Sequence, residues 1–403
     1  MSVSPTSPRL AVVVSHPTQY YSPWFRWLHA HERIDLRVFY LWDFGVTHQR
    51  DPKFEVSFQW DTDLLSGYEH EFVPNTARAP GTHHFWGLRN PALTTRLATW
   101  APQVILLFGY NWASHLRVIL WARLRGFPLI FRGDSHFIGR ERPAPVQRWL
   151  LRLLYRQFAG FLPVGAANRD YFTTLGVPAS RLFFAPHAVD DTLFDPTRVD
   201  HQSASQNLRT QLRVPEGHHV VLFAGKLVPE KQPRELLTAF LSLGDPTATL
   251  IFVGEGPEKP ALTAAAHSAR AGNVHFLPFA NQSEMPARLL LADVFVLPSR
   301  GVFETWGLTV NEAMHLGVPA LVSDRVGCQR DLVTPGETGW VFRHDDPADL
   351  RVQLGVALAT VRMPDQAAAL RVRVRQRIAG YTYAHAAAGL RAALAYSRDA
   401  FAS

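Results

Sequence analysis

The sequence predicts an α/β fold made of two successive, doubly wound halves, and three observations carry this prediction. The chain has 403 residues, whereas one domain usually spans roughly 100–200 residues. Short apolar runs alternate with longer mixed segments along the whole chain. These runs are continuously apolar, which is typical of parallel strands that are covered on both faces.

Six runs in the first half are expected strands. They lie at residues 10–15, 36–40, 104–108, 128–132, 161–164 and 182–185. Helices are expected at 114–124 and 144–158, between consecutive strands. This order of strand, helix and strand is the order of a parallel sheet with helices on its faces.

A polar stretch rich in turn-forming residues, 195–215, interrupts the pattern, and a short helix is expected in its middle. The second half then continues with expected strands at 220–224, 249–254, 274–277, 294–298 and 319–323, with expected helices at 234–243 and from 307 to about 317, and with an alanine-rich helix at 381–401. We therefore expect a first domain over 1–200, a linker over 201–216, a second domain over 217–380 and a terminal helix over 381–403.

The composition indicates a folded protein, because 47% of residues are hydrophobic and 19% are charged. The formal charge of +7 suits an anionic small molecule, an anionic membrane face or nucleic acid. No basic run with interleaved aromatic residues is present, so no nucleic acid partner is expected. The single cysteine, Cys328, excludes an intramolecular disulfide and suits a reducing compartment.

We expect a cytoplasmic protein, because no secretion signal and no spanning segment of ~20 apolar residues is recognisable. A contact with the inner face of an anionic membrane is left open by Arg148, Arg152 and Arg156, which recur every four residues. The other interpretation of this basic stripe is a half-buried helix whose arginines extend to solvent.

Two carboxylates flank an expected helix start. Glu304 precedes the helix that begins near Gly307, and Glu312 lies within it. The free N–H groups and the dipole at such a start favour a phosphate. Carboxylates accept hydrogen bonds from sugar and ribose hydroxyls. The pattern therefore indicates a site for a phosphorylated sugar or nucleoside.

A second cluster follows the strand at 220–224. Gly225 allows a close backbone approach, and Lys226 and Lys231 follow it in one loop. Two ammonium groups would bind a diphosphate and would stabilise the charge that develops as it leaves.

These motifs resemble the donor-binding domain of family 4 glycosyltransferases. The stretches read FAGKLVPEKQPRELLTAF, FVGEGP and VLPSRGVFETWGLTVNEAMHLGVPALVSDRVGCQRDLVTPGETGWVF. Glu304 and Glu312 are similar to the E-x7-E motif of that family. The resemblance is strong over about 217–345 and weak over the first half. It implies a GT-B fold of two Rossmann-like domains facing a cleft, and a retaining glycosyltransferase that needs no metal or other cofactor. It also implies that the terminal helix, 381–403, crosses back to the first domain.

The resemblance also implies roles for these residues. Lys226 and Lys231 would bind the donor diphosphate, and the lysine at 226 replaces the arginine that is commoner there, which keeps the charge but loses the planar fork. Glu304 would contact hydroxyls of the transferred sugar, so Glu304, Lys231 and Lys226 are the expected catalytic residues. Glu312 would hold the ribose.

The backbone contributes further expected donor contacts. Gly307 and Leu308 would offer N–H groups to phosphate, and the turn that begins at Gly254 would wall the nucleotide pocket. The expected partners are a nucleotide-diphosphate sugar and a glycan, a lipid-linked or a small-molecule acceptor. A place in cell-envelope or exopolysaccharide synthesis is implied by the family.

Polar clusters also follow three strands of the first half and predict the acceptor side, since ligands of such sheets lie beyond the carboxyl ends of strands. His16 and Asp134 are the candidates, with a structural role in their turns as the alternative. His16 begins a His-Pro-Thr-Gln loop where many family members have Gly-Gly, so a phosphate contact is not carried over to this loop.

Two other functions remain open at the level of the sequence. A nucleotide-sugar epimerase on the same fold would turn over the donor without an acceptor. A non-catalytic partner subunit would bind the nucleotide sugar and release nothing. The adjacent histidine pairs His83-His84 and His218-His219 do not have the spacing of metal ligands, so no metal site is expected.

Overall fold

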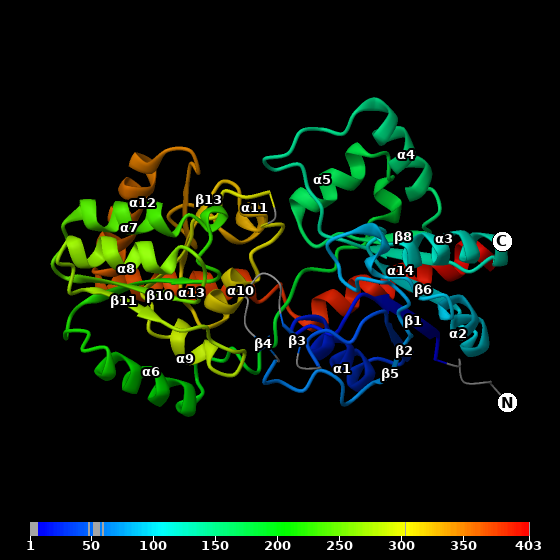
Figure 1. Cartoon of the computed structure of the whole chain (residues 1–403), viewed down its shortest axis with the longest axis horizontal. Coiled ribbons are helices and arrows are strands. Elements are labelled where there is room, and N and C mark those ends of the chain that lie inside the picture. Colours follow the sequence, from blue (N-terminus) through cyan, green and yellow to red (C-terminus); the bar gives the residue numbers. More distant parts are fainter. Residues whose placement is uncertain (1–6, 47–48, 51–56, 59, 303, 403) are drawn as a thin grey trace. The chain divides into compact units, whose positions relative to one another are not determined.

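The computed structural model describes residues 7–46, 49–50, 57–58, 60–302 and 304–402, and it divides into two compact units. The first unit comprises Met1–Ser135, Arg142–Pro186 and Tyr383–Ser403. The second unit comprises His136–Glu141 and His187–Thr382. Each unit is a parallel sheet covered by helices (Figure 1).

The first unit contains a six-stranded parallel sheet in the order β5-β2-β1-β6-β7-β8. Its strands are β1 (Arg9–Val14), β2 (Asp35–Tyr40), β5 (Glu69–Phe72), β6 (Val104–Phe108), β7 (Leu129–Arg132) and β8 (Gly160–Leu162). The central strands β1 and β6 pair in register, with Leu10 opposite Val104. Both strands are buried almost throughout, which explains their continuous apolar sequences. A short antiparallel pair, β3 (Gln49–Arg50) and β4 (Ser57–Phe58), lies outside this sheet.

Six α-helices belong to the described residues of the first unit. They are α1 (Tyr21–His31), α2 (Leu93–Trp100), α3 (Ala113–Arg125), α4 (Pro145–Tyr155), α5 (Ala166–Thr174) and α14 (Tyr383–Ala402). The last helix, α14, contacts β7, β8 and α1 (Figure 1). Its apolar face, which includes Leu390, is buried.

The second unit repeats the architecture with the order β11-β10-β9-β12-β13-β14. Its strands are β9 (His219–Ala224), β10 (Ala248–Val253), β11 (Val274–Leu277), β12 (Val294–Leu297), β13 (Ala320–Ser323) and β14 (Gly339–Phe342). Its helices are α6 (Val199–Gln211), α7 (Pro233–Leu243), α8 (Lys259–Ser268), α9 (Met285–Leu289), α10 (Leu308–His315), α11 (Gln329–Leu332), α12 (Pro347–Val361) and α13 (Pro364–Ile378). Short 3₁₀ turns occur in both units, at Phe85–Gly87, Ala179–Arg181 and Pro229–Lys231.

Local sequence signals explain several of these boundaries. Proline opens α7 and α12, where its missing N–H costs nothing. The Asp346 carboxylate caps α12 by accepting hydrogen bonds from the N–H groups of Ala348 and Asp349, at 3.0 and 3.1 Å. Gly126 ends α3 with a φ of 74°, a left-handed conformation that glycine adopts readily.

Two doubly wound parallel halves were predicted, and the two sheets confirm this. Some details differ. The predicted strand at 182–185 makes only one bridge, between Leu182 and Phe161, because it only extends the edge of β8. The chain enters the second unit at His187, and the segment expected as a linker is largely α6, a mostly exposed helix that contacts α9. None of the helices in the described part of the chain is long and apolar enough to span a bilayer.

Candidate functional site

The predicted donor residues of the second unit lie where its strand order reverses. Chain order runs outward from β9 to β10 and β11 on one side, and β12 begins the other side. Such a switch point is the usual ligand site of a doubly wound sheet. Lys231 follows β9 and Glu304 follows β12, so the two residues come from opposite sides of this point.

The structure brings Lys231 and Glu304 together as an ion pair, although 73 positions separate them in sequence. The Oγ of Ser299 also donates a hydrogen bond to the same carboxylate oxygen, at 2.8 Å. Both side chains of the ion pair are largely enclosed, with 27% exposed for Lys231 and 13% for Glu304. A partly enclosed cation next to a carboxylate suits a ligand that carries both phosphate and hydroxyl groups.

The charge of Glu304 is set by opposing effects. Burial disfavours the carboxylate, but the Lys231 ammonium and the hydrogen bonds from Lys231 and Ser299 outweigh burial and hold the pKa of Glu304 below its ordinary value. Glu304 is therefore a carboxylate at neutral pH. In this state it accepts hydrogen bonds and donates none.

The helix that follows Glu304 has an open N-terminus. Gly307 precedes α10 with a φ of 98°, and a side chain at this position would lie 2.9 Å from atoms of Leu297 and Val326. Within the described residues no side chain caps α10, whose first residue is Leu308. The geometry therefore leaves the helix start available to an anion, as the sequence predicts.

Glu312 lies inside α10 and is 1% exposed. Gln282 donates a hydrogen bond to its Oε1 at 3.3 Å. The two predicted carboxylates are therefore held differently, Glu304 by a cation and Glu312 by an amide. A ligand group that reaches Glu304 therefore meets a carboxylate beside an ammonium group. A ligand group that reaches Glu312 meets a carboxylate that is hydrogen-bonded to an amide.

Two glycine loops meet beside this cluster. Gly225 and Gly254 end β9 and β10, and a Cβ on Gly254 would lie 2.0 Å from the carbonyl oxygen of Gly225. A Cβ on Gly256 would similarly lie 2.3 Å from the carbonyl oxygen of Leu227. Lys226 lies in the first of these loops, partly buried. Only glycine allows the two loops to approach this closely.

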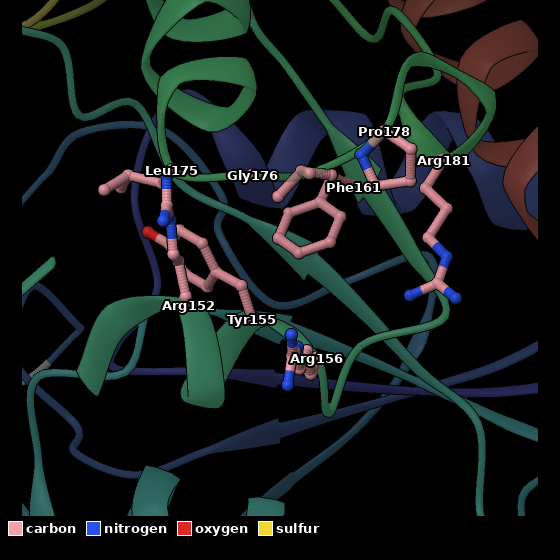
Figure 2. Close-up of a pocket in the computed structure, with 9 residues that line it drawn as sticks. Arg152, Tyr155, Arg156, Phe161, Leu175, Gly176, Pro178 and Arg181 are labelled. Carbon is pink, nitrogen blue, oxygen red and sulfur yellow. The ribbon is translucent and has the colours of Figure 1, made fainter. Parts of the chain in front are cut away.

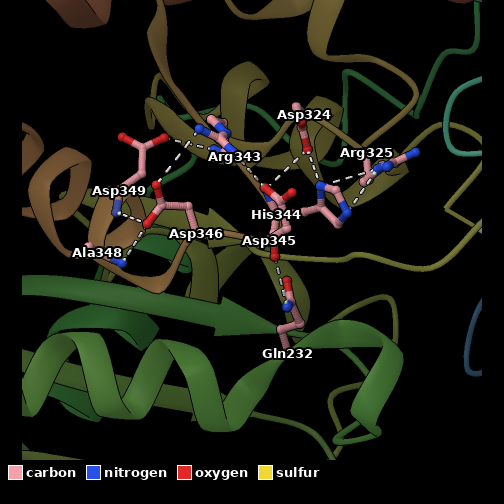
Figure 3. A network of polar contacts seen from close by, with 9 residues as sticks. All are labelled: Gln232, Asp324, Arg325, Arg343, His344, Asp345, Asp346, Ala348 and Asp349. Atoms are coloured by element: carbon pink, nitrogen blue, oxygen red, sulfur yellow. Dashed lines mark hydrogen bonds and ion pairs between the residues drawn. The ribbon is translucent and has the colours of Figure 1, made fainter.

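A second polar network occupies the ends of β13 and β14, and the sequence reasoning did not identify it (Figure 3). The imidazole of His344 lies 2.9 Å from the Asp324 carboxylate, and the guanidinium Nε of Arg325 lies 3.2 Å from the same ring. Gln232, next to Lys231, donates to the carbonyl of His344 at 3.1 Å. This network joins the β9 loop to the far strands of the sheet.

Ser299 and Gln282 were also missed. Ser299 lies two residues beyond β12, so the rule that ligands lie beyond strand ends would have included it. Gln282 precedes α9 and carries no local signal, because its role depends on a partner 30 positions away. Within the described ranges, no three His, Cys, Asp or Glu side chains gather as a metal site requires.

The acceptor candidates of the first unit follow β1 and β7. His16 contacts the rings of Trp42 and Phe44, and burial lowers its pKa to about 4, so its imidazole is neutral at pH 7. Asp134 is partly buried and acts electrostatically on Arg132. The first unit thus offers a neutral imidazole and a carboxylate at the same edge of its sheet.

Arg132 is a buried residue that the sequence reasoning did not single out. Its guanidinium is 2% exposed and donates to the carbonyl oxygens of Ala185 and Pro186, at 2.9 and 3.3 Å. It also lies 5.0 Å from the ring centroid of Trp24. Arg132 therefore holds the segment at Ala185 and Pro186, where the chain leaves the first unit for the second.

Comparison with known proteins agrees with this geometry. The family model described as glycosyl transferases group 1 matches residues 204–359. The D-inositol 3-phosphate glycosyltransferase of Corynebacterium efficiens is 31% identical over 294 residues, which are 65% of this chain and 67% of that protein. The chain belongs to the group 1 glycosyl transferases, also called family 4.

Other relatives match over a shorter part of their length. The GDP-mannose-dependent alpha-(1-6)-phosphatidylinositol monomannoside mannosyltransferase of Mycobacterium tuberculosis is 32% identical over 229 residues, which are 55% of this chain and 58% of that enzyme. The chain spans about half the length of a D-inositol 3-phosphate glycosyltransferase of Jonesia denitrificans, at 50%.

Solved structures share the fold at low identity. Anabaena HepE in complex with UDP and glucose aligns with a TM-score of 0.70 at 17% identity, over 97% of this chain and all of that one. WaaG, a glycosyltransferase involved in lipopolysaccharide biosynthesis, aligns with a TM-score of 0.63 at 15% identity, over 94% of this chain and 99% of that one. These alignments confirm the predicted GT-B fold.

Proposed function

We propose that this protein is a metal-independent, retaining glycosyltransferase that moves a sugar from a nucleotide-diphosphate donor to an acceptor hydroxyl. The observation that carries the proposal is the Lys231–Glu304 ion pair at the switch point of the second sheet, beside the open start of α10. Cationic, anionic and helix-dipole groups at one place suit a ligand with phosphates and hydroxyls.

The proposed reaction uses these groups as follows. The acceptor oxygen forms a bond to the anomeric carbon as the bond from that carbon to the diphosphate oxygen breaks, and the diphosphate leaves with the electron pair. Lys226, Lys231 and the start of α10 stabilise the charge on the diphosphate. The acceptor proton passes to a departing phosphate oxygen. Glu304 and Glu312 hold the sugar and ribose hydroxyls.

The proposal also extends to the nucleotide base of the donor and to the class of acceptor. The printed names of the relatives include GDP-mannose and phosphatidylinositol monomannoside for one, and UDP and glucose for a structural neighbour. A hexose donor with a uridine or guanosine diphosphate is accordingly the first to test. A role in envelope or exopolysaccharide synthesis follows from the same reasoning.

A lipid-linked acceptor is favoured by α4. Val146, Trp149 and Leu150 are 68%, 58% and 54% exposed on one side of this helix, and no acidic residue occurs between Arg142 and Arg169. An exposed apolar stripe flanked by cations is typical of a helix that lies on an anionic membrane. The protein would then meet its acceptor at the cytoplasmic face of that membrane.

The test of the proposed function is a metal-free thermal-shift panel of UDP-, GDP- and ADP-sugars. At a hundredfold excess over Kd, a ligand of the folded state adds about 2.7 kcal/mol, or about 5–10 °C for a unit of this size. One nucleotide series should produce this shift in the wild type and in Arg351→Ala, an exposed cation on α12. Lys231→Ala should abolish it.

The outcomes separate the proposal from its alternatives. If no donor shifts the melting temperature at millimolar concentration, the donor site is wrong. If a donor binds but is interconverted with its epimer in the absence of an acceptor, the protein is an epimerase. A donor that binds and yields neither product nor free nucleoside diphosphate with any acceptor would indicate a non-catalytic partner subunit.

A further inference from the structure

A pocket of about 260 Å³ lies in the first unit between the ends of α4 and α5 (Figure 2). Arg152, Arg156 and Arg181 surround it, and the rings of Tyr155 and Phe161 lie between them (Figure 2). One water molecule needs only about 10–15 Å³ of cavity, so the pocket has room for a phosphate group with part of its hydration.

The topology separates this pocket from the acceptor candidates. His16 and Asp134 follow the carboxyl ends of β1 and β7. By contrast, α4 and α5 run back across the sheet, and their last turns come just before the chain pairs again at Gly160 and Leu182. The pocket therefore lies at the amino edge of the sheet, opposite the edge where ligands of this fold usually bind.

The pocket adjoins a second one through two shared residues. This neighbour has a volume of about 290 Å³ and is lined by Arg156 and Arg181 again, together with Arg123 from α3 and Tyr396 from α14. None of the described residues that line either pocket is acidic. Four arginines thus line two adjoining pockets.

These four guanidinium groups have no partner among the described residues. Carboxylates elsewhere in the unit are paired with other arginines, such as Asp35 with Arg9. Gly176, with a φ of 88°, leaves room for Arg152, whose Nε would lie 3.4 Å from a Cβ at this position. Arg181 is partly buried, so its charge is only partly screened by water.

Helix dipoles do not account for this charge. The C-termini of α3, α4 and α5 all end near the two pockets. Each of the three helix ends carries roughly half a negative charge, so together they offset only about one and a half of the four positive charges of the arginines. Arg123, Arg152 and Arg156 are exposed and Arg181 is partly buried, so the remaining positive charge is accessible to an anion from solution, and guanidinium groups match phosphate oxygens with paired hydrogen bonds.

We propose that the two pockets form one arginine site, made by Arg123, Arg152, Arg156 and Arg181, that binds a phosphate-bearing anion. The floor of the first pocket is apolar, since Phe161, Leu175 and Val177 are buried there. The same helix that supplies Arg152 and Arg156 exposes Trp149 and Leu150. The phosphate comes either from a phospholipid headgroup or from a soluble ligand, and the arginine site is independent of the donor site.

The experiment compares two double variants that remove equal charge. Arg152→Gln/Arg181→Gln removes two site arginines, whereas Arg33→Gln/Arg117→Gln removes two exposed arginines of the first unit that line neither pocket and lie outside α4. Titration calorimetry with inorganic pyrophosphate is carried out in a Lys231→Ala background, so that the donor site does not contribute. Co-sedimentation with phosphatidylglycerol vesicles, against phosphatidylcholine vesicles, is carried out on the same proteins. Circular dichroism and melting curves check folding.

We expect at least roughly tenfold weaker binding in the site variant and little change in the control. Weaker vesicle binding assigns the site to a lipid headgroup, and weaker pyrophosphate binding with unchanged vesicle binding assigns it to a soluble ligand. Equal losses in both variants would mean diffuse attraction and would overturn the arginine site. Unchanged binding of both probes in the site variant would overturn it as well. Either result leaves the donor assignment unaffected.

Discussion

At the scale of single residues, two strand-end groups are kept in opposite states of charge. Glu304 stays ionised because Lys231 and Ser299 supply hydrogen bonds and charge. His16 stays neutral because it is enclosed by Trp42 and Phe44, and burial lowers the pKa of its imidazole. The first arrangement suits a ligand with phosphate and hydroxyl groups, and the second suits a hydrogen bond with a neutral acceptor.

The state of His16 has a consequence for stability. Its pKa is about 4 in the folded protein, against 6.5 in an unfolded chain. Between these values the unfolded chain binds more protons, so stability rises with pH and is lost as pH falls from 6.5 to 4. The contribution is at most about 3 kcal/mol. His115, with a pKa lowered to about 3 by burial, acts in the same direction.

We therefore expect His16→Gln to melt with a shallower pH dependence than the wild type between pH 6.5 and 4. Differential scanning calorimetry across this range measures the difference. His29→Gln, at an exposed position of α1, is the control and should follow the wild type. A His16→Gln curve parallel to that of the wild type would show that His16 is not buried in its neutral form.

At the scale of elements, the glycine loops after β9 and β10 act as one unit. Backbone bonds join them, including Leu227 N–H to the carbonyl of Glu255 at 2.9 Å. Because the contact is between two main chains, no side-chain adjustment relieves an added atom at Gly254. The position of Lys226, after β9, therefore depends on the absence of a side chain at Gly254, which follows the neighbouring strand β10.

Gly254→Ala should separate the two loops. We expect a loss of about 3 kcal/mol or more in the second unit, from the collision and from a φ of 142°, together with loss of the donor-induced melting shift. Gly336→Ala is the matched control, with a φ of 77° and no atom within 4 Å of the added Cβ. It should cost about 1–2 kcal/mol and keep the donor response. Equal behaviour of the two variants in the thermal-shift assay would contradict the role of the close approach.

The elements also show what the sequence could and could not predict. Central strands such as β6 were predicted at their bounds because burial on both faces demands an unbroken apolar run. The edge strand β5 was missed because its sequence, EHEF, is polar and only partly buried. A short helix was predicted within 195–215, but not the 13 residues of α6, because only His201 and Ser205 are buried and no apolar period marks its bounds.

The residues of the candidate site also divide into those that the sequence predicted and those that it did not. Lys231, Glu304 and Gly307 were predicted because they belong to motifs that are continuous in sequence. Ser299 and Gln282 were not, because hydrogen bonds between distant strands leave no periodic trace. The arginine site was not predicted from the sequence, for a related reason. Arg152 and Arg156 were noticed as a stripe on one helix, whereas Arg181 comes from another segment.

At the scale of the whole molecule, each unit has its own core and the chain passes between them more than once. The first unit is completed by α14, which lies beyond the entire second unit in sequence. Independent cores predict separable stabilities, since a change in one core removes contacts from that unit alone.

We expect Leu390→Ala, in α14, to cost about 2–5 kcal/mol in the first unit only. Hydrogen exchange measured by mass spectrometry should lose protection in β7, β8 and α1, the elements that α14 contacts. Leu354→Ala, equally buried in α12, should give the reverse pattern. Comparable losses of protection in both units from either variant would mean that the two units unfold together.

The return of the chain at Tyr383 also bears on biosynthesis. Ribosomes add about 5–20 residues per second, so the roughly 200 residues between Pro186 and α14 take about 10–40 s to emerge. During that interval β7 and β8 lack the helix that covers them, and the second unit is complete at its end, before α14 has emerged. The half that is translated first is therefore finished last, and the nascent chain exposes an apolar sheet face that chaperones would recognise.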